Sequence, residues 1–532
     1  MTLQGKSLLA GKTGAPGGAT FRAVNPATGE LLAPDFHEAS LTEVDATLHA
    51  AAAAFQVYRA QPPATRAQLL EAIATAIEAL GEALIQRAQA ETGLPVARLQ
   101  GERARTCGQL RLFAQVVREG SWVDARIDPA LPARQPLPRP DIRRTLVPLG
   151  PVVVFGSSNF PFAFSVAGGD TASALAAGCP VIVKAHRAHA GTAELVGHAV
   201  TQAVAACGLP AGLFSLVHGG GATIGIAMVK HPVVTAVGFT GSQAAGRALC
   251  DAAAARPHPI PVFAEMSSLN PVFLLPGALR ERSAPIARDL LASFTLGVGQ
   301  FCTKPGLIFA QPGVETEAFL TALGVAVRNV PCATMLTSGI RTAFLENRRK
   351  ITSTPGVSRL ATASAVPEAH KTEGEASVAV TTAANFLARP ALATEAFGPF
   401  TLVILAENPD EFMACARALE GQLTATVHGN DSDLTAAAPL LALLEQKAGR
   451  LVVNGFPTGV EVCHAMTHGG PSPATSDPRF TSVGTTALLR FARPVCYQGF
   501  PDALLPDALR NSNPLGLLRM INGVPTREAC SS

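Results

Sequence analysis

Residues 150–159 read GPVVVFGSSN, and this stretch decides the fold class of the chain. Its core, residues 152–155, is a short, unbroken apolar run, which is typical of a strand buried on both faces of a parallel sheet. Similar runs alternate with helical stretches further along the chain, at 181–183, 214–217 and 236–239. Strands that alternate with helices predict an α/β fold, in which ligands bind beyond the carboxyl ends of the parallel strands.

The pattern differs on either side of this region. Upstream, helical periodicity predicts three helices, at 41–59, 66–91 and 96–119. A proline-rich connector follows, and because proline cannot continue a helix we expect it to be extended, with 142–149 as one strand of a hairpin. Downstream, four more apolar runs predict a second α/β unit, at 272–275, 306–309, 401–404 and 450–453.

The composition excludes several classes of protein. Of the 532 residues, 48% are hydrophobic and only 15% are charged, which excludes a disordered chain. The net charge is +3 with no basic stripe, which argues against a nucleic-acid partner. No run approaches the ~18 apolar residues of a membrane-spanning helix, and the N-terminus lacks the pattern of a signal peptide. We therefore expect a soluble, cytoplasmic protein.

The ten cysteines are scattered and form no Cys-x-x-Cys pair. In a cytosolic chain, most cysteines are small buried apolar residues. The nearest approach to a cluster of metal ligands is Cys463-His464 with His468, which we interpret as polar residues of a loop. No metal is expected.

Two features suit a ligand that carries phosphate, although the dinucleotide fingerprint Gly-x-Gly-x-x-Gly is absent. Residues 239–242, Phe-Thr-Gly-Ser, join a predicted strand to a predicted helix, where free N–H groups would bind an anion unless this is an ordinary tight turn. Lys184 ends another predicted strand, with His186 and Arg187 close behind. Three such cations would meet a ribose edge or a 2′-phosphate unless they are simply solvated.

Three residues are candidates for catalysis. Cys302 follows a glycine-rich approach and is a potential nucleophile, provided that its surroundings favour the thiolate over an inert thiol. Glu265 directly follows an apolar strand, where burial would raise its pKa toward that of a general base; the alternative is a structural carboxylate. Asn159 follows the first core strand and could donate to an oxyanion, or merely form a turn.

Taken together and in order, these segments resemble the aldehyde dehydrogenase superfamily. The resemblance runs from Asn25 to about Tyr497 and is carried by a specific set of motifs, which are Asn159-Phe160-Pro161, Val183-Lys184, Phe239-Thr240-Gly241-Ser242, Glu265, Gly299-Gln300-Phe301-Cys302 and Glu395-Ala396-Phe397-Gly398-Pro399. It implies a Rossmann-like cofactor domain, an α/β catalytic domain and a small β arm that makes the protein a homodimer or homotetramer.

The resemblance also implies the roles of the catalytic residues. Cys302 would attack the aldehyde carbon, and the Asn159 side chain with the Cys302 N–H would hold the oxyanion. Loss of hydride to the nicotinamide would leave a thioester, which water activated by Glu265 would hydrolyse.

A second set of residues would bind the cofactor. Lys184 and Glu395 would hold the ribose hydroxyls, and Phe397 would pack beside the nicotinamide. Ser242 would meet the pyrophosphate, with Gly241 allowing its close approach.

The sequence departs from the common superfamily pattern at two places. Ser157-Ser158 stands where Pro-Trp usually precedes the oxyanion asparagine, so the pocket loses an indole. Arg187 replaces the glutamate often found three residues after the cofactor lysine. An arginine favours a 2′-phosphate where a carboxylate would repel it, so we expect NADP or NAD to serve, with NADP slightly favoured.

Several segments resemble the branch of 2,5-dioxovalerate (α-ketoglutarate semialdehyde) dehydrogenases, which includes NADP-dependent fatty aldehyde dehydrogenases; they are 264–271, 459–466, 468–471 and 493–498. The expected substrate is thus α-ketoglutarate semialdehyde. Its carboxylate needs a cation, for which we propose Arg105 or Arg111 on the predicted helix 96–119, with Phe160 also lining the site. The same two arginines could instead form salt bridges.

Three other functions stay open at this point. The same chemistry could act on aliphatic aldehydes, which a tunnel without cations would favour. An acyl transfer to coenzyme A is disfavoured, because it needs no base such as Glu265 to activate water. A non-catalytic role is disfavoured because Cys302, Glu265, Asn159 and Lys184 occur together.

The resemblance divides the chain into parts. Residues 1–125 and 149–264 would bind NAD(P), and 265–475 would form the catalytic domain. The arm would comprise 126–148 and 476–500, and 501–532 would be a C-terminal extension.

Overall fold

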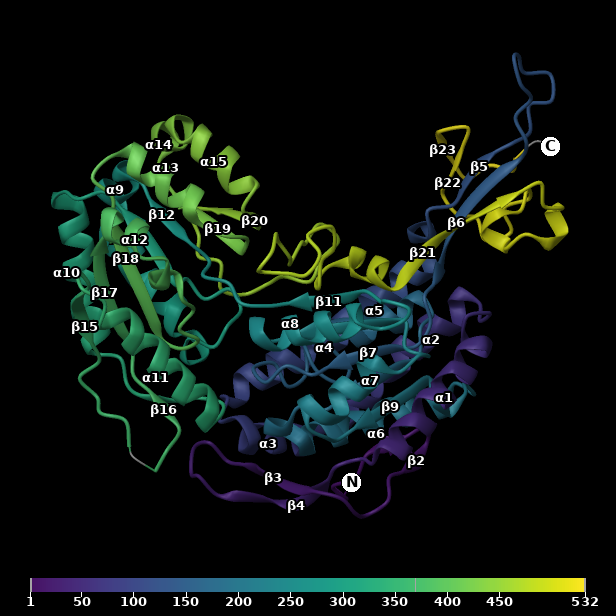
Figure 1. Ribbon diagram of the computed structural model, residues 1–532, viewed down its shortest axis with the longest axis horizontal. Helices are drawn as coiled ribbons and strands as arrows, with labels where there is room; N and C mark the ends of the chain where they lie inside the picture. Colours follow the sequence, from purple (N-terminus) through teal and green to yellow (C-terminus); the bar gives the residue numbers. More distant parts are fainter. Residues whose placement is uncertain (1, 369, 531–532) are drawn as a thin grey trace.

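The computed structural model describes residues 2–368 and 370–530, and its three larger sheets are set apart from one another along the molecule (Figure 1). Two of these sheets carry helices and form the α/β units, which confirms the predicted fold class. The third forms an arm that projects at the upper right of Figure 1.

The first sheet has the strand order β11-β10-β7-β8-β9-β1-β2. Its strands are β1 (Leu8–Leu9), β2 (Lys12–Thr13), β7 (Val152–Phe155), β8 (Val181–Lys184), β9 (Phe214–Val217), β10 (Ala236–Thr240) and β11 (Val262–Glu265). The strands from β11 to β9 are parallel, and every residue of β7, β8 and β9 is buried, as their unbroken apolar runs predict.

Eight helices accompany this sheet: α1 (Leu41–Tyr58), α2 (Pro63–Ala79), α3 (Gly81–Thr92), α4 (Val96–Glu119), α5 (Gly169–Ala177), α6 (Ala190–Ala206), α7 (Ile226–Lys230) and α8 (Gln243–Ala254). Helix α1 begins at a capping box in which Ser40 and Glu43 satisfy each other's backbone N–H groups. The single helix predicted at 66–91 is wrong, because Gly81 adopts a left-handed φ of 58° and separates α2 from α3.

The second sheet has the order β15-β17-β18-β13-β12-β19-β20. Its strands are β12 (Val272–Leu274), β13 (Leu307–Ala310), β15 (Ser358–Thr362), β17 (Ser377–Thr382), β18 (Phe400–Leu405), β19 (Gln422–His428) and β20 (Ala448–Val453). All are parallel except β15, which is antiparallel to β17. Its helices are α9 (Pro276–Thr295), α10 (Val314–Arg328), α11 (Ser338–Thr352), α12 (Ala383–Ala388), α13 (Pro409–Ala418), α14 (Asp431–Ala436) and α15 (Ala438–Glu445).

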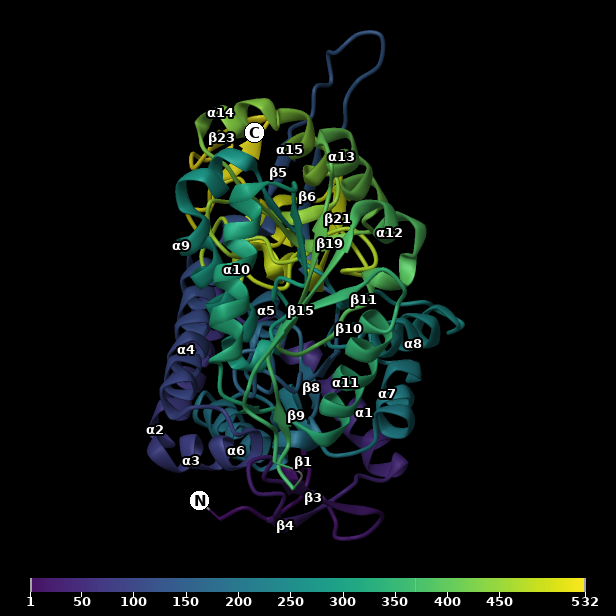
Figure 2. The same cartoon turned by 90° about the vertical axis from the view of Figure 1, so that its left-hand side faces the viewer.

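The arm sheet has the order β21-β6-β5-β22-β23. It is built from β5 (Arg126–Asp128), β6 (Ile142–Pro148), β21 (Ala492–Gln498), β22 (Arg519–Ile521) and β23 (Val524–Thr526). The tail 501–530 therefore joins the arm of its own chain, because β22 runs parallel to β5. Both views show the loop between β5 and β6 extending beyond the rest of the arm (Figure 2).

Two smaller pairs complete the fold, β3 (Thr20–Val24) with β4 (Leu31–His37) and β14 (Ala333–Thr334) with β16 (Glu373–Gly374). Among the residues described, no helix is long and apolar enough to cross a membrane. The carboxyl ends of the parallel strands β7, β8, β10 and β11 lie on the same side of the first sheet. Four candidate residues lie at or just after these ends, namely Asn159, Lys184, Ser242 and Glu265.

Candidate active site

Three reactive side chains from distant parts of the chain meet in one cluster. The Cys302 Sγ lies 3.3 Å from His468 Nε2, and the same Nε2 lies 2.9 Å from Glu265 Oε1. Glu265 ends β11, Cys302 follows the short 3₁₀ helix Leu296–Gly299, and His468 lies in the segment between β20 and β21. The Glu265 and His468 side chains are buried, so their charges interact with little screening by solvent.

Backbone pairing brings His468 to the end of β11. Met266 N donates to Ala474 O at 2.8 Å, and Ser476 N donates to Ala264 O at 3.0 Å. The segment that contains these residues, drawn yellow-green in Figure 1, runs alongside β11. The Gly-Gly that follows His468 permits this, because a Cβ on Gly470 would lie 2.1 Å from Gln422 O.

The cluster is an ion pair beside a thiol. Burial alone would lower the pKa of His468, but Glu265 and Cys302 raise it to about 10. Burial would likewise raise the pKa of Glu265, but His468, Ser482 and Cys302 lower it below its usual value. Our expectation of a raised pKa for Glu265 is thus wrong, because it considered burial without the buried histidine.

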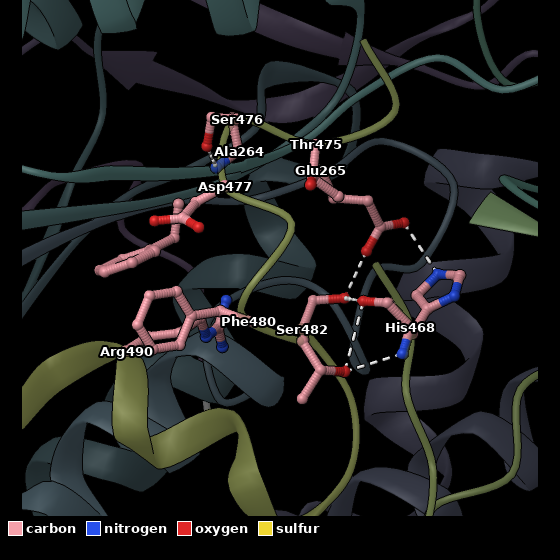
Figure 3. A pocket seen from close by; sticks show the side chains of 11 residues that line it. Ala264, Glu265, His468, Thr475, Ser476, Asp477, Phe480, Ser482 and Arg490 are labelled. Carbon is pink, nitrogen blue, oxygen red and sulfur yellow. Dashed lines mark hydrogen bonds and ion pairs between the residues drawn. The ribbon is translucent and has the colours of Figure 1, made fainter. Parts of the chain in front are cut away.

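Two hydroxyl groups hold the residues of this pair. Ser482 Oγ donates to Glu265 Oε2 at 2.5 Å, opposite the oxygen that faces His468, as Figure 3 shows. Thr481 Oγ1 accepts the backbone N–H of His468 at 2.7 Å. A cavity of about 20 Å³ beside these residues has room for about one water molecule.

The backbone before Cys302 adopts an unusual conformation. Gly297, Val298 and Gly299 all have left-handed φ values, of 55°, 56° and 67°. A side chain at Gly299 would collide with Gly398, since its Cβ would lie 2.3 Å from that carbonyl. Beyond the turn, Asn270 Nδ2 donates to Cys302 O at 2.8 Å and fixes the residue from the other side.

Asn159 lies next to this turn. Its Nδ2 donates to Gln300 O at 3.0 Å, which leaves the second amide hydrogen for another acceptor. Arg98 donates to Asn159 O at 2.8 Å, and the buried Glu102 accepts from the N–H groups of Phe162 and Ala163. Two residues of α4 therefore hold the 159–163 loop, and the amide could stabilise an oxyanion formed at Cys302.

The structure separates the three candidate substrate residues. Arg105 is half-buried, lies over the Phe164 ring at 5.3 Å, and interacts electrostatically with Cys302. Phe160 packs edge-on against Phe301, whose neighbour is Cys302. Arg111 instead forms a half-exposed ion pair with Glu78 at 2.6 Å. Both arginines line a cavity of about 510 Å³ between α4 and residues 460–462.

Part of the expected cofactor site has a suitable geometry. Lys184 is buried at the end of β8, where burial lowers its pKa to about 8. Ser242 caps α8 by accepting the Ala245 N–H at 3.3 Å, and a Cβ on Gly241 would lie 2.7 Å from the Phe239 ring. A buried cation, a capped helix start and a glycine without room for a side chain fit a dinucleotide.

Of the predicted cofactor residues, His186 and Arg187 offer less positive charge than we expected. Burial lowers the pKa of His186 well below its usual value, so this ring is neutral and adds no cation. Arg187 donates to Glu38 and lies 4.7 Å above the Phe21 ring, so a carboxylate already shares its charge.

Glu395 and Phe397 lie in the segment before β18. Burial raises the pKa of Glu395, and a hydrogen bond from the Ser267 side chain reduces this shift without cancelling it. Phe397 is half-buried.

His468 is the functional residue that the sequence patterns did not assign to the site. We interpreted it as a loop residue near Cys463 and His464, and the structure shows it against Cys302 and Glu265 instead. Its position before Gly-Gly was the available signal, because paired glycines mark a close backbone approach. By donor type, the Cys302–His468–Glu265 cluster could also hold a metal ion, as could Asp45, His49 and His231 on the surface.

Comparison with known proteins gives consistent results. The model of the "Aldehyde dehydrogenase family" matches residues 14–473. "Alpha-ketoglutaric semialdehyde dehydrogenase 2" of Azospirillum brasilense is 56% identical over 526 residues, which cover 98% of this chain and 99% of the relative. "Alpha-ketoglutaric semialdehyde dehydrogenase" of Acinetobacter baylyi is 46% identical over 526 residues, with the same two coverages of 98% and 99%.

Solved structures share the fold at low sequence identity. Betaine aldehyde dehydrogenase from Staphylococcus aureus in complex with NAD⁺ has a TM-score of 0.80 at 19% identity, covering 94% of this chain and 95% of that one. 3,6-Anhydro-L-galactose dehydrogenase in complex with NADP has a TM-score of 0.79 at 22% identity, with coverages of 93% and 99%.

Proposed function

This chain belongs to the aldehyde dehydrogenase family, and from that premise we propose that it oxidises α-ketoglutarate semialdehyde to 2-oxoglutarate with NAD(P). The observation that carries the proposal is the cluster of Cys302, His468 and Glu265 with the Arg105 guanidinium in electrostatic range. The names of the relatives that are 56% and 46% identical support the same substrate.

The first step forms a bond between the Cys302 sulfur and the aldehyde carbon. The His468 imidazolium places a positive charge 3.3 Å from this sulfur. The thiolate is the form of cysteine that attacks a carbonyl carbon. The carbonyl oxygen becomes an oxyanion, which the free hydrogen of the Asn159 amide would stabilise. NAD(P), when bound, supplies the acceptor for the hydride that must leave before a thioester exists.

The second step is hydrolysis of the thioester. Acylation removes the negative charge from Cys302, so His468 loses one of the two anions that raise its pKa. The Glu265–His468 pair then takes a proton from a water molecule, whose oxygen attacks the thioester carbon. The bond between the acyl carbon and the sulfur then breaks, the acid leaves, and the proton held by the pair passes to the Cys302 sulfur or to solvent, which restores the site. Ser482 keeps the Glu265 carboxylate oriented throughout.

The cofactor preference rests on Arg187. We propose that both cofactors serve, with NADP slightly favoured, because Arg187 offers a guanidinium to a 2′-phosphate. The pairing of Arg187 with Glu38 limits that preference. A ratio of kcat/KM values that favours NAD by more than about tenfold would contradict it.

The substrate end of the proposal rests on Arg105 and Phe160. Arg105 would pair with the carboxylate, and Phe160 would form an apolar wall beside the carbon chain. Arg111 lines the same cavity, but its guanidinium is paired with Glu78, so we do not assign it to the substrate carboxylate.

The division of the chain into domains and the assembly are further parts of the proposal. We propose that 1–125 with 149–264 binds NAD(P), that 265–475 is catalytic, that 126–148 and 476–500 form the arm, and that 501–532 is a C-terminal extension. Among the residues that the structure describes, no strand pairs with the outer edges of β21 in the arm sheet and β20 in the second sheet. Open edges favour pairing with a second copy, so we propose a homodimer or homotetramer. We also propose that the protein is cytoplasmic.

The experiment is a comparison of substrates. Formation of NADH or NADPH is measured with α-ketoglutarate semialdehyde, succinic semialdehyde and an aliphatic aldehyde, each with both cofactors. A preference for the 2-oxo acid supports the proposal, and a preference for the aliphatic aldehyde contradicts the proposed substrate. A Cys302→Ser variant tests the mechanism, which is wrong if turnover survives unchanged.

A further inference from the structure

Two arginines from different α/β units hold one loop. Arg105 of α4 donates through Nη2 to Val460 O at 3.4 Å. Arg450 of β20 donates through Nη1 to Gly459 O at 3.1 Å and through Nη2 to Pro457 O at 2.5 Å. The carbonyl groups of the loop 457–460 thus accept hydrogen bonds from two guanidiniums, one from each unit of the fold.

These contacts leave both guanidiniums with unused donors. A guanidinium has five N–H donors and no acceptor. Arg105 Nη1 and Arg450 Nε are buried, yet neither has a hydrogen-bond partner among the residues that the structure describes. A buried donor without an acceptor lowers stability, so such groups point to an acceptor that a ligand brings.

The charge of Cys302 acts on both arginines. Burial lowers the pKa of Arg105 and of Arg450, and in each case the charge of Cys302 opposes this shift. The charges of Glu102, Glu461 and Glu265 also act on Arg105. Two cations with unused donors therefore lie within electrostatic range of Cys302, at a loop whose residues Val460 to Val462 line the same cavity as Arg105.

We propose that Arg450 acts with Arg105 as a two-arginine receptor for the 2-oxo acid end of the substrate. Arg105 pairs with the carboxylate, and Arg450 donates to the 2-oxo oxygen and the nearer carboxylate oxygen. This inference rests on the proposed function, of which Arg105 is already part, and it adds Arg450 as a residue that determines specificity.

The chemistry of the substrate matches this arrangement. A 2-oxo carboxylate presents several acceptor oxygens in one plane, which a pair of planar guanidiniums can satisfy together. An alkyl chain would leave the same donors buried and unpaired, so a neutral aldehyde is disfavoured. Succinic semialdehyde keeps a carboxylate but lacks the 2-oxo group, and it therefore tests the role of Arg450 separately from that of Arg105.

The experiment compares four variants, Arg450→Gln, Arg450→Lys, Arg105→Gln and the control Arg118→Gln. Arg118 lies on the same helix as Arg105, but it does not line the cavity and forms an exposed ion pair with Glu71. Each variant is assayed with α-ketoglutarate semialdehyde, succinic semialdehyde and pentanal, and its thermal midpoint is recorded.

We expect Arg450→Gln to raise KM for α-ketoglutarate semialdehyde by about tenfold or more, with kcat changed far less. The loss with succinic semialdehyde should be smaller, and pentanal should be oxidised as well as or better than by the unaltered protein. Arg450→Lys should recover only part of the loss, because an ammonium lacks the fork of donors. Arg105→Gln should raise KM for both semialdehydes by the same factor, and Arg118→Gln should change neither KM.

Two results would overturn the inference. If Arg450→Gln lowers kcat/KM for all three aldehydes by the same factor, Arg450 serves only to hold the 457–460 loop. If it changes none of them while the thermal midpoint is kept, Arg450 is no part of the receptor. Failure of the proposed function itself looks different, because the unaltered protein would then show no preference for the 2-oxo acid.

Discussion

One buried histidine sets the charges of the active site. His468 Nε2 contacts both the nucleophile and the carboxylate, and their negative charges raise its pKa to about 10. The imidazolium in turn lowers the pKa of Glu265. The titrations of His468 and Glu265 are therefore coupled, and removal of either residue changes the pKa of the other.

Replacing His468 tests this coupling. We expect His468→Asn to reduce kcat/KM by about a hundredfold or more, because the thiolate loses its cation and the water-activating pair loses a member. The rate at which iodoacetamide alkylates Cys302 near neutral pH should fall as well. His464→Asn is the matched control, since His464 is exposed four residues away and should leave both rates unchanged.

Lys184 gives a pH dependence of cofactor binding. Burial lowers its pKa to about 8, so the free protein loses this cation as the pH rises through that value. The dissociation constant of NADP, measured by calorimetry, should therefore increase between about pH 7 and 9. Lys184→Met should bind more weakly and lose this pH dependence, whereas the exposed Lys12→Gln should keep it. An unaltered pH profile in Lys184→Met would show that another group is responsible.

Among the elements, the segment after β20 shows how glycines place a catalytic side chain. Gly469 and Gly470 leave no room for a Cβ, which would lie 2.6 Å from Phe480 O and 2.1 Å from Gln422 O. Gly470 also has a φ of 150°, which residues with a side chain rarely adopt. His468 reaches Cys302 only because the backbone beside it packs this closely.

The Gly470→Ala variant is expected to lower both stability and activity. The new methyl group must displace backbone, so we expect a loss of about 2 kcal/mol or more in the free energy of unfolding. Turnover should fall further than stability alone explains, because His468 moves with the segment. Gly101→Ala is the control: this residue lies within α4 with open space around it, and alanine there should stabilise by about 0.5–1 kcal/mol. Normal activity of Gly470→Ala would refute the explanation.

At the scale of the whole molecule, the sequence predicted those strands and helices whose residue pattern is determined locally. The unbroken apolar runs predicted β7 to β10 of the first sheet and β12, β13, β18 and β20 of the second. The short strands β1 and β2 were missed, as were β15, β17 and β19, in which polar residues interrupt the apolar ones. The grouping of Cys302, Glu265 and Asn159 into one site came from the family resemblance and not from these runs. Helix 96–119 was predicted to its ends because Pro95 and Gly120 mark them. The break between α2 and α3 was missed, because the apolar spacing continues across Gly81.

What the sequence could not reveal are contacts between distant segments. His468 and Glu265 are 203 positions apart, so no spacing rule connects them. No spacing rule connects Glu38 with Arg187 or Glu78 with Arg111 either. These carboxylates pair with two arginines that we assigned to ligand binding from the sequence. Charge states were the least predictable property, because a pKa depends on every group that the fold brings near.

The tail offers a test of whether the arm and the active site are independent. Arg519 is buried in the tail and donates to three carbonyl groups, those of Arg510, Asn511 and Glu528. We expect Arg519→Gln to destabilise the tail locally by about 2–3 kcal/mol, because charged hydrogen bonds are lost from a buried site. Limited proteolysis should then remove the tail faster, while kcat for the aldehyde stays unchanged.

Arg527→Gln is the matched control for this experiment, since Arg527 lies in the same tail with 57% of its side chain exposed. An exposed ion pair contributes little, so this variant should resist proteolysis like the unaltered protein. If Arg519→Gln instead lowers kcat while the tail stays resistant, the arm communicates with the Cys302 cluster. Independence is the expected outcome. Among the described residues, β22 and β23 pair only within the arm sheet. Cys302, Glu265 and His468 are instead held by the two α/β units and by the segment that joins them to the arm.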